Sequence, residues 1–512
     1  MSVLSGPRRA LAGLVTAGAG IAVSVAVTNL LHARANPIQA VAETIIEITP
    51  GSIAESLIHV VGKNDKPLLI TGVTVVILLL GAVAGLLSGR RRWPGSLLFV
   101  AMAAVALAAE ASRPEFGAAT LIPLAAGLAT WLLVLLWLVP DGLAAPEPAI
   151  GRADSRSTST RRGFLLRAGG VAVAAAVVSV LGDMAGRGRR TVESTRRALH
   201  LPVNAGTVPG DVSAGIDVGD MAPWRTPNDR FYRIDTALVL PAVDPDTWKL
   251  RIHGMVDKDI VIDYQDLVSR KMTETWVTIC CVSNPVGGGL IGNAYWSGVR
   301  IADLLAEAGV HPGATAVKQT SQDGWTCGTP IQALTDDRNA MLAVAMNGEP
   351  LPIEHGFPVR MIVPGLFGYV SATKWLVDLE VTRFDKFSAY WTERGWSPRG
   401  PIKTESRIEA PRNGAQVKAG TVGVGGHAWA QHTGIAKVEY QLDGHAWQRA
   451  ELGGVPDLDT WVQWAGRVDV QPGSHLLKVR ATDKSGYTQT GAQMGVLPDG
   501  ATGWHRIGFS AA

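Results

Sequence analysis

The chain has 512 residues, of which 47% are hydrophobic and 18% are charged, and its mean hydropathy is +0.17. The charged fraction is below the roughly 25% typical of soluble domains. This excludes a disordered chain and indicates membrane-spanning segments joined to a soluble part. The net charge is only +3, from 47 basic and 44 acidic residues, so we expect no nucleic acid partner.

Residues 1–145 are predicted to form an all-α transmembrane region of four helices. A span needs about 20 apolar residues, and Leu11–Leu31, Leu68–Leu87 and Gly117–Val139 meet that length with almost no charge. The shorter run Ser96–Ala109 could be a buried soluble helix, but its place between two spans favours a fourth crossing. Arginines in alternate loops predict that both ends of the region lie in the cytoplasm. No span carries a histidine pair for haem, so we expect an anchor or docking bundle.

Residues 146–185 are predicted to hold an export signal and a fifth transmembrane helix. The sequence Ser159-Thr160-Arg161-Arg162-Gly163-Phe164-Leu165-Leu166 precedes an Ala- and Val-rich stretch, Ala168–Leu181. It resembles the twin-arginine signal, which exports cargo already folded around a cofactor. The alternative is an ordinary basic flank of a membrane helix. With no small-x-small cleavage site, we expect a multi-pass protein of a bacterial plasma membrane whose later residues lie on the extracytoplasmic side.

Residues 186–216 are predicted as a linker, and residues 217–400 as a mixed α+β domain. The stretches Trp248–Gly254 and Lys374–Val381 have the pattern of strands, whereas Ile301–Ala308 has that of an amphipathic helix. Short β-rich runs that alternate with helical ones favour a mixed fold.

Residues 401–512 are predicted to form an all-β domain after a Pro-, Gly- and Ser-rich linker, Gly395–Ile402. Two strand-like runs, Val438–Gln441 and Trp447–Ala450, flank Asp443-Gly444, a pair that tolerates the positive φ of a hairpin turn. Alternation at this spacing over about 100 residues is typical of an immunoglobulin-like β-sandwich.

Two adjacent cysteines lie in the β-rich sequence Thr278-Ile279-Cys280-Cys281-Val282-Ser283-Asn284. Neighbours in a strand face opposite sides, so one thiol can enter a site while the other packs. Structural zinc would need further Cys or His at ligand spacing, and buried inert cysteine is the default for such residues. The following Gly287-Gly288-Gly289 lets the backbone approach a bulky ligand closely. It lacks the pattern of a nucleotide-phosphate loop.

Several motifs in this order resemble the sulfite oxidase family of molybdopterin-binding oxidoreductases. The motifs are the Cys281 segment, Trp296-Ser297-Gly298-Val299, Asn347–Pro352, His355–Arg360, Val363-Pro364-Gly365 and Lys374-Trp375-Leu376. The resemblance runs from about Asp217 to the C-terminus. It implies a mixed α/β domain with a molybdenum–molybdopterin cofactor, followed by an immunoglobulin-like domain of the dimerisation type. A homodimer through that domain is the assembly it implies.

By this resemblance Cys281 is the molybdenum ligand, since a soft thiolate suits a high-valent metal, and Cys280 is a non-ligand. Arg233 matches the arginine at the substrate end of the site, where it would be catalytic by orienting a polar substrate. The cofactor-binding residues so implied are Arg233, Cys281, Ser283, Asn284, His355, Arg360, Ser371 and Lys374. Cations among them suit the dianionic pterin phosphate. The alternative for these charges is solvated loops or surface ion pairs.

Two departures from the family concern the substrate. Sulfite oxidases have two arginines after the family asparagine, where this chain has Pro285 and Val286. They also have an active-site tyrosine where this chain has Arg394-Gly395-Trp396. Because two charge-assisted contacts are missing, sulfite is open to question as the substrate.

We therefore expect a membrane-anchored enzyme that transfers an oxygen atom, with two electrons, on a small oxyanion or an S- or N-oxide. There is no C-x-x-C-H haem motif, so a separate redox partner is expected to exchange the electrons. The alternative is a non-catalytic membrane receptor or adhesion protein, in which the sandwich is the working part and the cofactor domain is vestigial.

Overall fold

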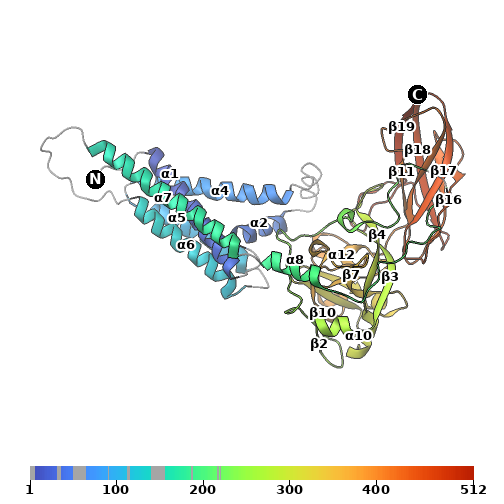
Figure 1. The fold of residues 1–512 in the computed structure, drawn as a ribbon, viewed down its shortest axis with the longest axis horizontal. Coiled ribbons are helices and arrows are strands. Elements are labelled where there is room, and N and C mark those ends of the chain that lie inside the picture. Colours follow the sequence, from blue (N-terminus) through green and yellow to red (C-terminus); the bar gives the residue numbers. More distant parts are fainter. Residues whose placement is uncertain are drawn as a thin grey trace. The chain divides into compact units, whose positions relative to one another are not determined.

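The structure, a computed structural model, describes residues 6–31, 36–49, 65–89, 91–111, 116–139, 156–185, 188–215, 218–219 and 221–512. It divides into two compact units (Figure 1). One unit comprises the chain up to Thr191 with Ala237–Leu240, and the other comprises Val192–Thr236 and Pro241–Ala512. The domain boundaries predicted near 145, 185 and 216 fall on or beside residues outside the described ranges.

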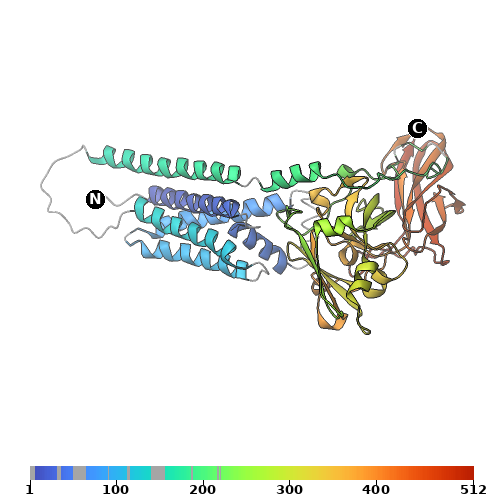
Figure 2. The same ribbon diagram turned by 60° about the horizontal axis from the view of Figure 1, so that its bottom comes forward.

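The first unit is a helical bundle. Its helices are α1 (Gly6–Leu30), α2 (Pro37–Ile48), α4 (Asp65–Leu87), α5 (Trp93–Ala111), α6 (Ala118–Leu138) and α7 (Arg156–Ala185). Helix α1 packs against α4, α6 and α7 (Figure 2). The approach to α4 is close, because a Cβ at Gly13 would lie 2.0 Å from the carbonyl oxygen of Gly81. The indole N–H of Trp131 in α6 donates to the carbonyl of Ala17 at 3.0 Å. Small residues that let helices touch are typical of membrane bundles.

Four described helices are long and apolar enough to cross a membrane: Gly6–Leu30, Lys66–Leu87, Trp93–Ala111 and Thr120–Leu138. They coincide with the four predicted spans, and the short run at Ser96–Ala109 belongs to a helix of 19 residues. The predicted fifth span falls on α7. The side chains at both ends of α7, including part of the twin-arginine motif, lie outside the described residues, so that span stays a prediction.

The second unit begins at Val192, within the segment 186–216 that is predicted as a linker, and described residues of that segment contact the mixed domain. Helix α8 (Gly188–Ala198) places Val192 in a core cluster with Phe231 and Trp296. Arg196 pairs with Glu193 one turn away and donates to the carbonyl of Pro350 at 3.1 Å. This short helix, which was not predicted from the sequence, is supported by the i,i+3 ion pair between Glu193 and Arg196.

The mixed α+β domain contains two sheets. The first has the strand order β2–β1–β10–β5–β6, and the second has the order β3–β4–β7–β8 with β9 paired to β7. The elements are η2 (Asn228–Arg230), β1 (Lys249–Gly254), β2 (Ile260–Asp263), α9 (Tyr264–Ser269), β3 (Met272–Cys280), β4 (Ile291–Arg300), α10 (Ile301–Ala308), β5 (Ala316–Ser321), β6 (Thr326–Pro330), α11 (Ile331–Thr335), β7 (Met341–Met346), β8 (Glu349–Pro350), η3 (Ile353–His355), β9 (Arg360–Ile362), α12 (Gly368–Ser371), β10 (Leu376–Thr382), η4 (Phe384–Lys386) and η5 (Thr392–Arg394). The two predicted strands are confirmed as β1 and β10, which pair in parallel. The predicted helix is confirmed as α10.

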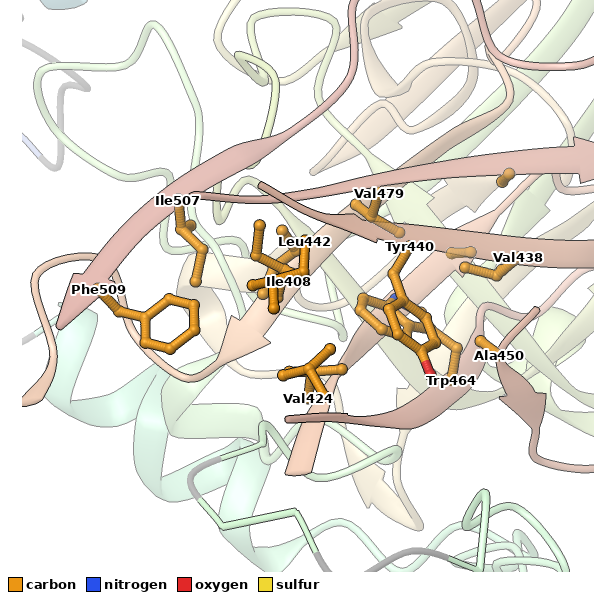
Figure 3. Close-up of a cluster of buried hydrophobic side chains, with 14 of the residues drawn as sticks. Ile408, Val424, Val438, Tyr440, Leu442, Ala450, Trp464, Val479, Ile507 and Phe509 are labelled. Carbon is orange, nitrogen blue, oxygen red and sulfur yellow. The ribbon is translucent and has the colours of Figure 1, made fainter. Parts of the chain in front are cut away.

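The C-terminal region consists of two sheets that share one apolar core. Their strand orders are β11–β13–β17–β16 and β12–β19–β18–β14–β15. The strands are β11 (Glu405–Ala410), β12 (Gln416–Val417), β13 (Gly420–Trp429), β14 (Ile435–Leu442), β15 (Gln448–Arg449), β16 (Glu451–Leu452), β17 (Val462–Val470), β18 (Gly473–Asp483) and β19 (Arg506–Ala511). Val424, Trp464 and Ile507 meet in the core (Figure 3). The predicted hairpin is confirmed, since β14 pairs with β15 around Asp443 and Gly444 at φ 47° and 77°.

Candidate active site

A cavity in the second unit brings together segments from across the mixed domain. Its volume is about 110 Å³. Its lining comes from the segment before β1, the end of β3, the β5–β6 turn, η3, β9, α12 and the residues on both sides of η5. The residues that line it include Phe231, Tyr232, Ile234, Asp235, Thr236, Cys281, Ser283, Asp323, Trp325, His355, Arg360, Gly368, Lys374, Trp391 and Trp396.

The two cysteines separate as predicted at the end of β3. Cys280 is fully buried and does not line the cavity, whereas Cys281 is 8% exposed and does. The Cys281 N–H donates to the carbonyl of Leu290 at 2.9 Å, which fixes the backbone under the thiol. Burial raises the pKa of the Cys281 thiol, although hydrogen bonds from Ser283 and the charge of Lys374 act in the opposite direction. All three cysteines of the chain are free.

Two cations line the cavity and are held by backbone carbonyls. Arg360 is 4% exposed, donates to the carbonyl of His355 at 3.0 Å, and lies 5.0 Å above the ring of Trp296. Burial lowers the Arg360 pKa to about 10, so it keeps its charge at neutral pH. Lys374 donates to Asp235 and to the carbonyl of Glu354, each at 3.1 Å. The Nε of Arg360 is buried without a hydrogen-bond partner among the described residues.

His355 lies beside these cations but is itself neutral at neutral pH. Its Nε2–H donates to the carbonyl of Asn228 at 3.0 Å. Burial and the charges of Arg360 and Lys374 lower its pKa to about 3. A neutral imidazole can act here only through hydrogen bonds.

Three other predicted site residues lie at the edge of the cavity or behind it. Arg233 is half exposed, lies 3.6 Å from Asp235, and is the one residue from Phe231 to Thr236 that does not line the cavity. The Asn284 amide oxygen accepts from the Leu290 N–H at 2.8 Å, inside the turn after Cys281. The Ser371 hydroxyl bonds to the carbonyls of Leu366 and Phe367. Ser283, by contrast, lines the cavity.

The glycine run contacts the C-terminal domain and does not line the cavity, contrary to its predicted role. A Cβ at Gly287, whose φ is +77°, would lie 2.2 Å from the ring of His505. The carbonyl of Gly288 accepts a hydrogen bond from Arg407 at 3.0 Å. The close approach that glycine permits is therefore used by another domain of the same chain.

Aromatic residues that the sequence reasoning missed complete the site. A Cβ at Gly368 would lie 3.6 Å from the carbonyl oxygen of Cys280 and 3.7 Å from the hydroxyl of Tyr232, so this phenol lies beside the cysteine pair. Burial, and then the nearby cysteines, raise the Tyr232 pKa well above its ordinary value. Trp391 and Trp396 line the cavity from a segment predicted as domain end and linker. The only available signal was the aromatic content of these segments.

Comparison with known proteins agrees with this geometry. The family described as "Oxidoreductase molybdopterin binding domain" matches residues 237–391. The chain is 30% identical over 340 residues to human mitochondrial sulfite oxidase, covering 56% of this chain and 61% of that one. It is 30% identical over 338 residues to sulfite oxidase of Gallus gallus, covering 55% and 72%. It is 34% identical over 182 residues to the uncharacterized oxidoreductase YuiH of Bacillus subtilis, covering 36% and 88%.

The family match thus defines residues 237–391 as an oxidoreductase domain that binds molybdopterin. The chain belongs to the sulfite oxidase family, although it spans only 61% of the human mitochondrial enzyme.

The residues present fit molybdenum–molybdopterin, the cofactor of this family. A buried thiol supplies a soft ligand. Arg360 and Lys374 supply donors for a phosphate, and the Nε–H of Arg360 has no acceptor among the described residues, so it can donate to one.

Proposed function

We propose that this chain is a membrane-anchored molybdenum enzyme that transfers an oxygen atom, with two electrons, to or from a small oxide. The observation that carries the proposal is the thiol of Cys281 in a cavity that Arg360 and Lys374 also line. The bound cofactor would supply the oxygen transfer and the two-electron change at molybdenum.

The chain's own residues would divide the remaining tasks. Cys281 would ligate the metal as thiolate, and Arg360 and Lys374 would hold the pterin phosphate by charge-assisted hydrogen bonds. His355 would keep its Nε2 proton on the Asn228 carbonyl and offer Nδ1 as an acceptor. Tyr232 stays protonated, so its phenol would donate a hydrogen bond to an oxygen near the Cys281 side of the cavity.

Within this reaction class, the lining favours a neutral S- or N-oxide over sulfite. Of the two cations of the lining, Lys374 pairs with the carboxylate of Asp235, and Arg233 lies outside the lining. A bound pterin phosphate would engage the same cations, which leaves no free cation of the lining for an anionic substrate. Trp325, Trp391 and Trp396 offer apolar area that suits an organic substituent.

Sulfite oxidation is the second candidate, because the relatives from human and Gallus gallus are named sulfite oxidases. Steady-state assays in both directions, with sulfite and with organic sulfoxides and N-oxides, would distinguish the two.

The setting of the enzyme is part of the proposal. Four described helices of sufficient length and apolarity support a multi-pass anchor in a bacterial plasma membrane. The twin-arginine resemblance supports a fifth span and an extracytoplasmic catalytic domain. Electrons would pass to or from a separate redox partner. The shared core of the two C-terminal sheets supports an immunoglobulin-like fold, through which the chain would form a homodimer.

The decisive experiment is molybdenum and pterin analysis of the full-length chain purified from a host that makes the pterin. About one molybdenum per chain, with turnover of at least one substrate, would support the enzyme. A metal-free, inactive chain would instead favour the receptor or adhesion alternative. That alternative is disfavoured because the thiol, both cations and the cavity are all retained.

A further inference from the structure

We name the segment Cys281–Gly288 the cysteine loop. The C-terminal domain forms hydrogen bonds with Thr278, just before this loop, and with Gly288 at its far end. Before the loop, the N–H of Thr278 donates to the Asp459 carbonyl at 2.9 Å, and the carbonyl of Thr278 accepts from the side chain of Gln431 at 3.0 Å. The Thr278 hydroxyl accepts from the Trp461 N–H at 2.8 Å. At the far end of the loop, Arg407 donates to the carbonyl of Gly288 at 3.0 Å.

The alternation of β11 explains why Arg407 reaches the loop. Ile408 points into the core of the C-terminal domain (Figure 3). Its neighbours Arg407 and Glu409 therefore face the other side of the strand. There the N–H of Ala222 donates to Glu409 at 2.8 Å, and the Arg407 guanidinium lies 5.4 Å above the Trp461 ring. Arg407 is thus directed toward the mixed domain by the pleat of its own strand.

Arg407 is held in a buried ionic network. Its Nε donates to Glu409 at 2.6 Å, and His427 contacts the same carboxylate oxygen at 3.0 Å. Arg407 is 8% exposed and His427 fully buried. Burial alone would raise the Glu409 pKa, but His427 and Arg407 outweigh it and bring the pKa to about 2. A charged, buried carboxylate fixes the guanidinium far better than a solvated surface pair would.

Hydrogen bonds between the start of the cysteine loop and Leu290 also hold the loop together internally. The Cys281 N–H donates to the Leu290 carbonyl at 2.9 Å, and the Leu290 N–H donates to Asn284 at 2.8 Å. A short loop closed internally and held on both sides leaves its backbone little freedom. The backbone that carries the Cys281 sulfur therefore lies between two points of contact with the C-terminal domain.

We propose that the C-terminal domain is a working part of the active site, and that Arg407 is a positioning residue for the molybdenum ligand, acting through Gly288. The contacts converge on the one loop that bears the ligand, so the domain does more than join copies of the chain. The inference rests on the assignment of Cys281 to molybdenum.

The test uses full-length protein carrying Arg407→Lys, which keeps the charge but cannot reach Glu409 and Gly288 with a rigid fork. A second variant, Arg407→Met with Glu409→Gln, removes the pair without leaving a buried charge unpaired. The matched control is Arg480→Lys, since Arg480 lies in the same domain and pairs with Glu439 at 3.0 Å. Molybdenum content, the Mo(V) electron paramagnetic resonance spectrum, kcat and KM are measured for each.

We expect both Arg407 variants to shift the Mo(V) spectrum and to lose about 10- to 100-fold in kcat, as outer-shell changes do. KM should stay near the wild-type value and Arg480→Lys should match wild type. A folded variant that has lost molybdenum also supports the proposal. Wild-type spectra and kcat in either molybdenum-replete variant would overturn it. Should both fail to fold, Gln431→Met, which removes only the bond to Thr278, is judged by the same spectral criterion. A wild-type chain without molybdenum would instead contradict the proposed function.

Discussion

Replacing Tyr232 by Phe removes the phenol that lies beside the cysteine pair. The ring should stay in place, because it stacks on Phe231 at 5.3 Å. A hydrogen bond to a group that bears charge is worth about 1.5–3 kcal/mol, which corresponds to about 10- to 150-fold in rate. We expect kcat to fall by that factor in the molybdenum-replete variant, while the melting temperature changes little.

The pH–rate profile of Tyr232→Phe provides a second test of the same role. Burial and the nearby cysteines hold the Tyr232 pKa well above its ordinary value, so the phenol does not titrate in the working range. Tyr232→Phe should therefore lower the whole pH–rate profile without changing its shape. Tyr264→Phe is the control, since that hydroxyl is buried without a partner among the described residues and lies outside the cavity lining. A replete Tyr232→Phe enzyme with kcat within about twofold of wild type, far below the range expected for a lost charge-assisted bond, would refute the role.

Three further predictions concern the metal ligand, a buried carboxyl and the glycine run. Cys281→Ser should abolish turnover while most of the cofactor stays bound through its phosphate contacts; an active, molybdenum-replete variant would refute the ligand assignment. Burial raises the Glu405 pKa to about 8, above the ordinary value of about 4.3. The buried Glu405 carboxyl therefore does not lower the free energy of unfolding below the ordinary pKa, and lowers it increasingly as pH rises toward 8. Glu405→Gln should raise the melting temperature more at pH 9 than at pH 5, and equal gains would contradict the reasoning. Gly287→Ala, at φ +77° and against the His505 ring, should cost about 1–3 kcal/mol of unfolding free energy; an unchanged denaturation midpoint would contradict it.

The sequence was sufficient for features that depend on local pattern. Alternation predicted β1 and β10, and the Asp443-Gly444 pair predicted a hairpin turn whose positive φ values the structure confirms. The two thiols face different surroundings because Cys280 ends a strand and Cys281 follows it. Each of these features is decided within a few residues.

Features decided by distant contacts could not be predicted in the same way. Gly287 indicates that another group packs closely against the backbone there, but the sequence does not show that this group is the ring of His505. The family resemblance points to Arg233, whereas the structure places the neighbouring Tyr232 in the cavity lining. Which of the two enters the cavity depends on how the extended segment lies against α12 and the end of β3. The neutrality of His355 likewise follows from burial that only the fold creates.

The parallel pairing of β1 with β10 sets Arg251 beside Asp378, so the first sheet joins the beginning of the mixed domain to its end. A chain emerging from the ribosome cannot complete that sheet until β10 has been made, and such distant pairings form slowly. Lys374 and Trp375, which precede β10, arrive at the same late moment. Trp391 and Trp396 follow β10 in the chain, so the lining of the pocket is complete only after the whole mixed domain has been made.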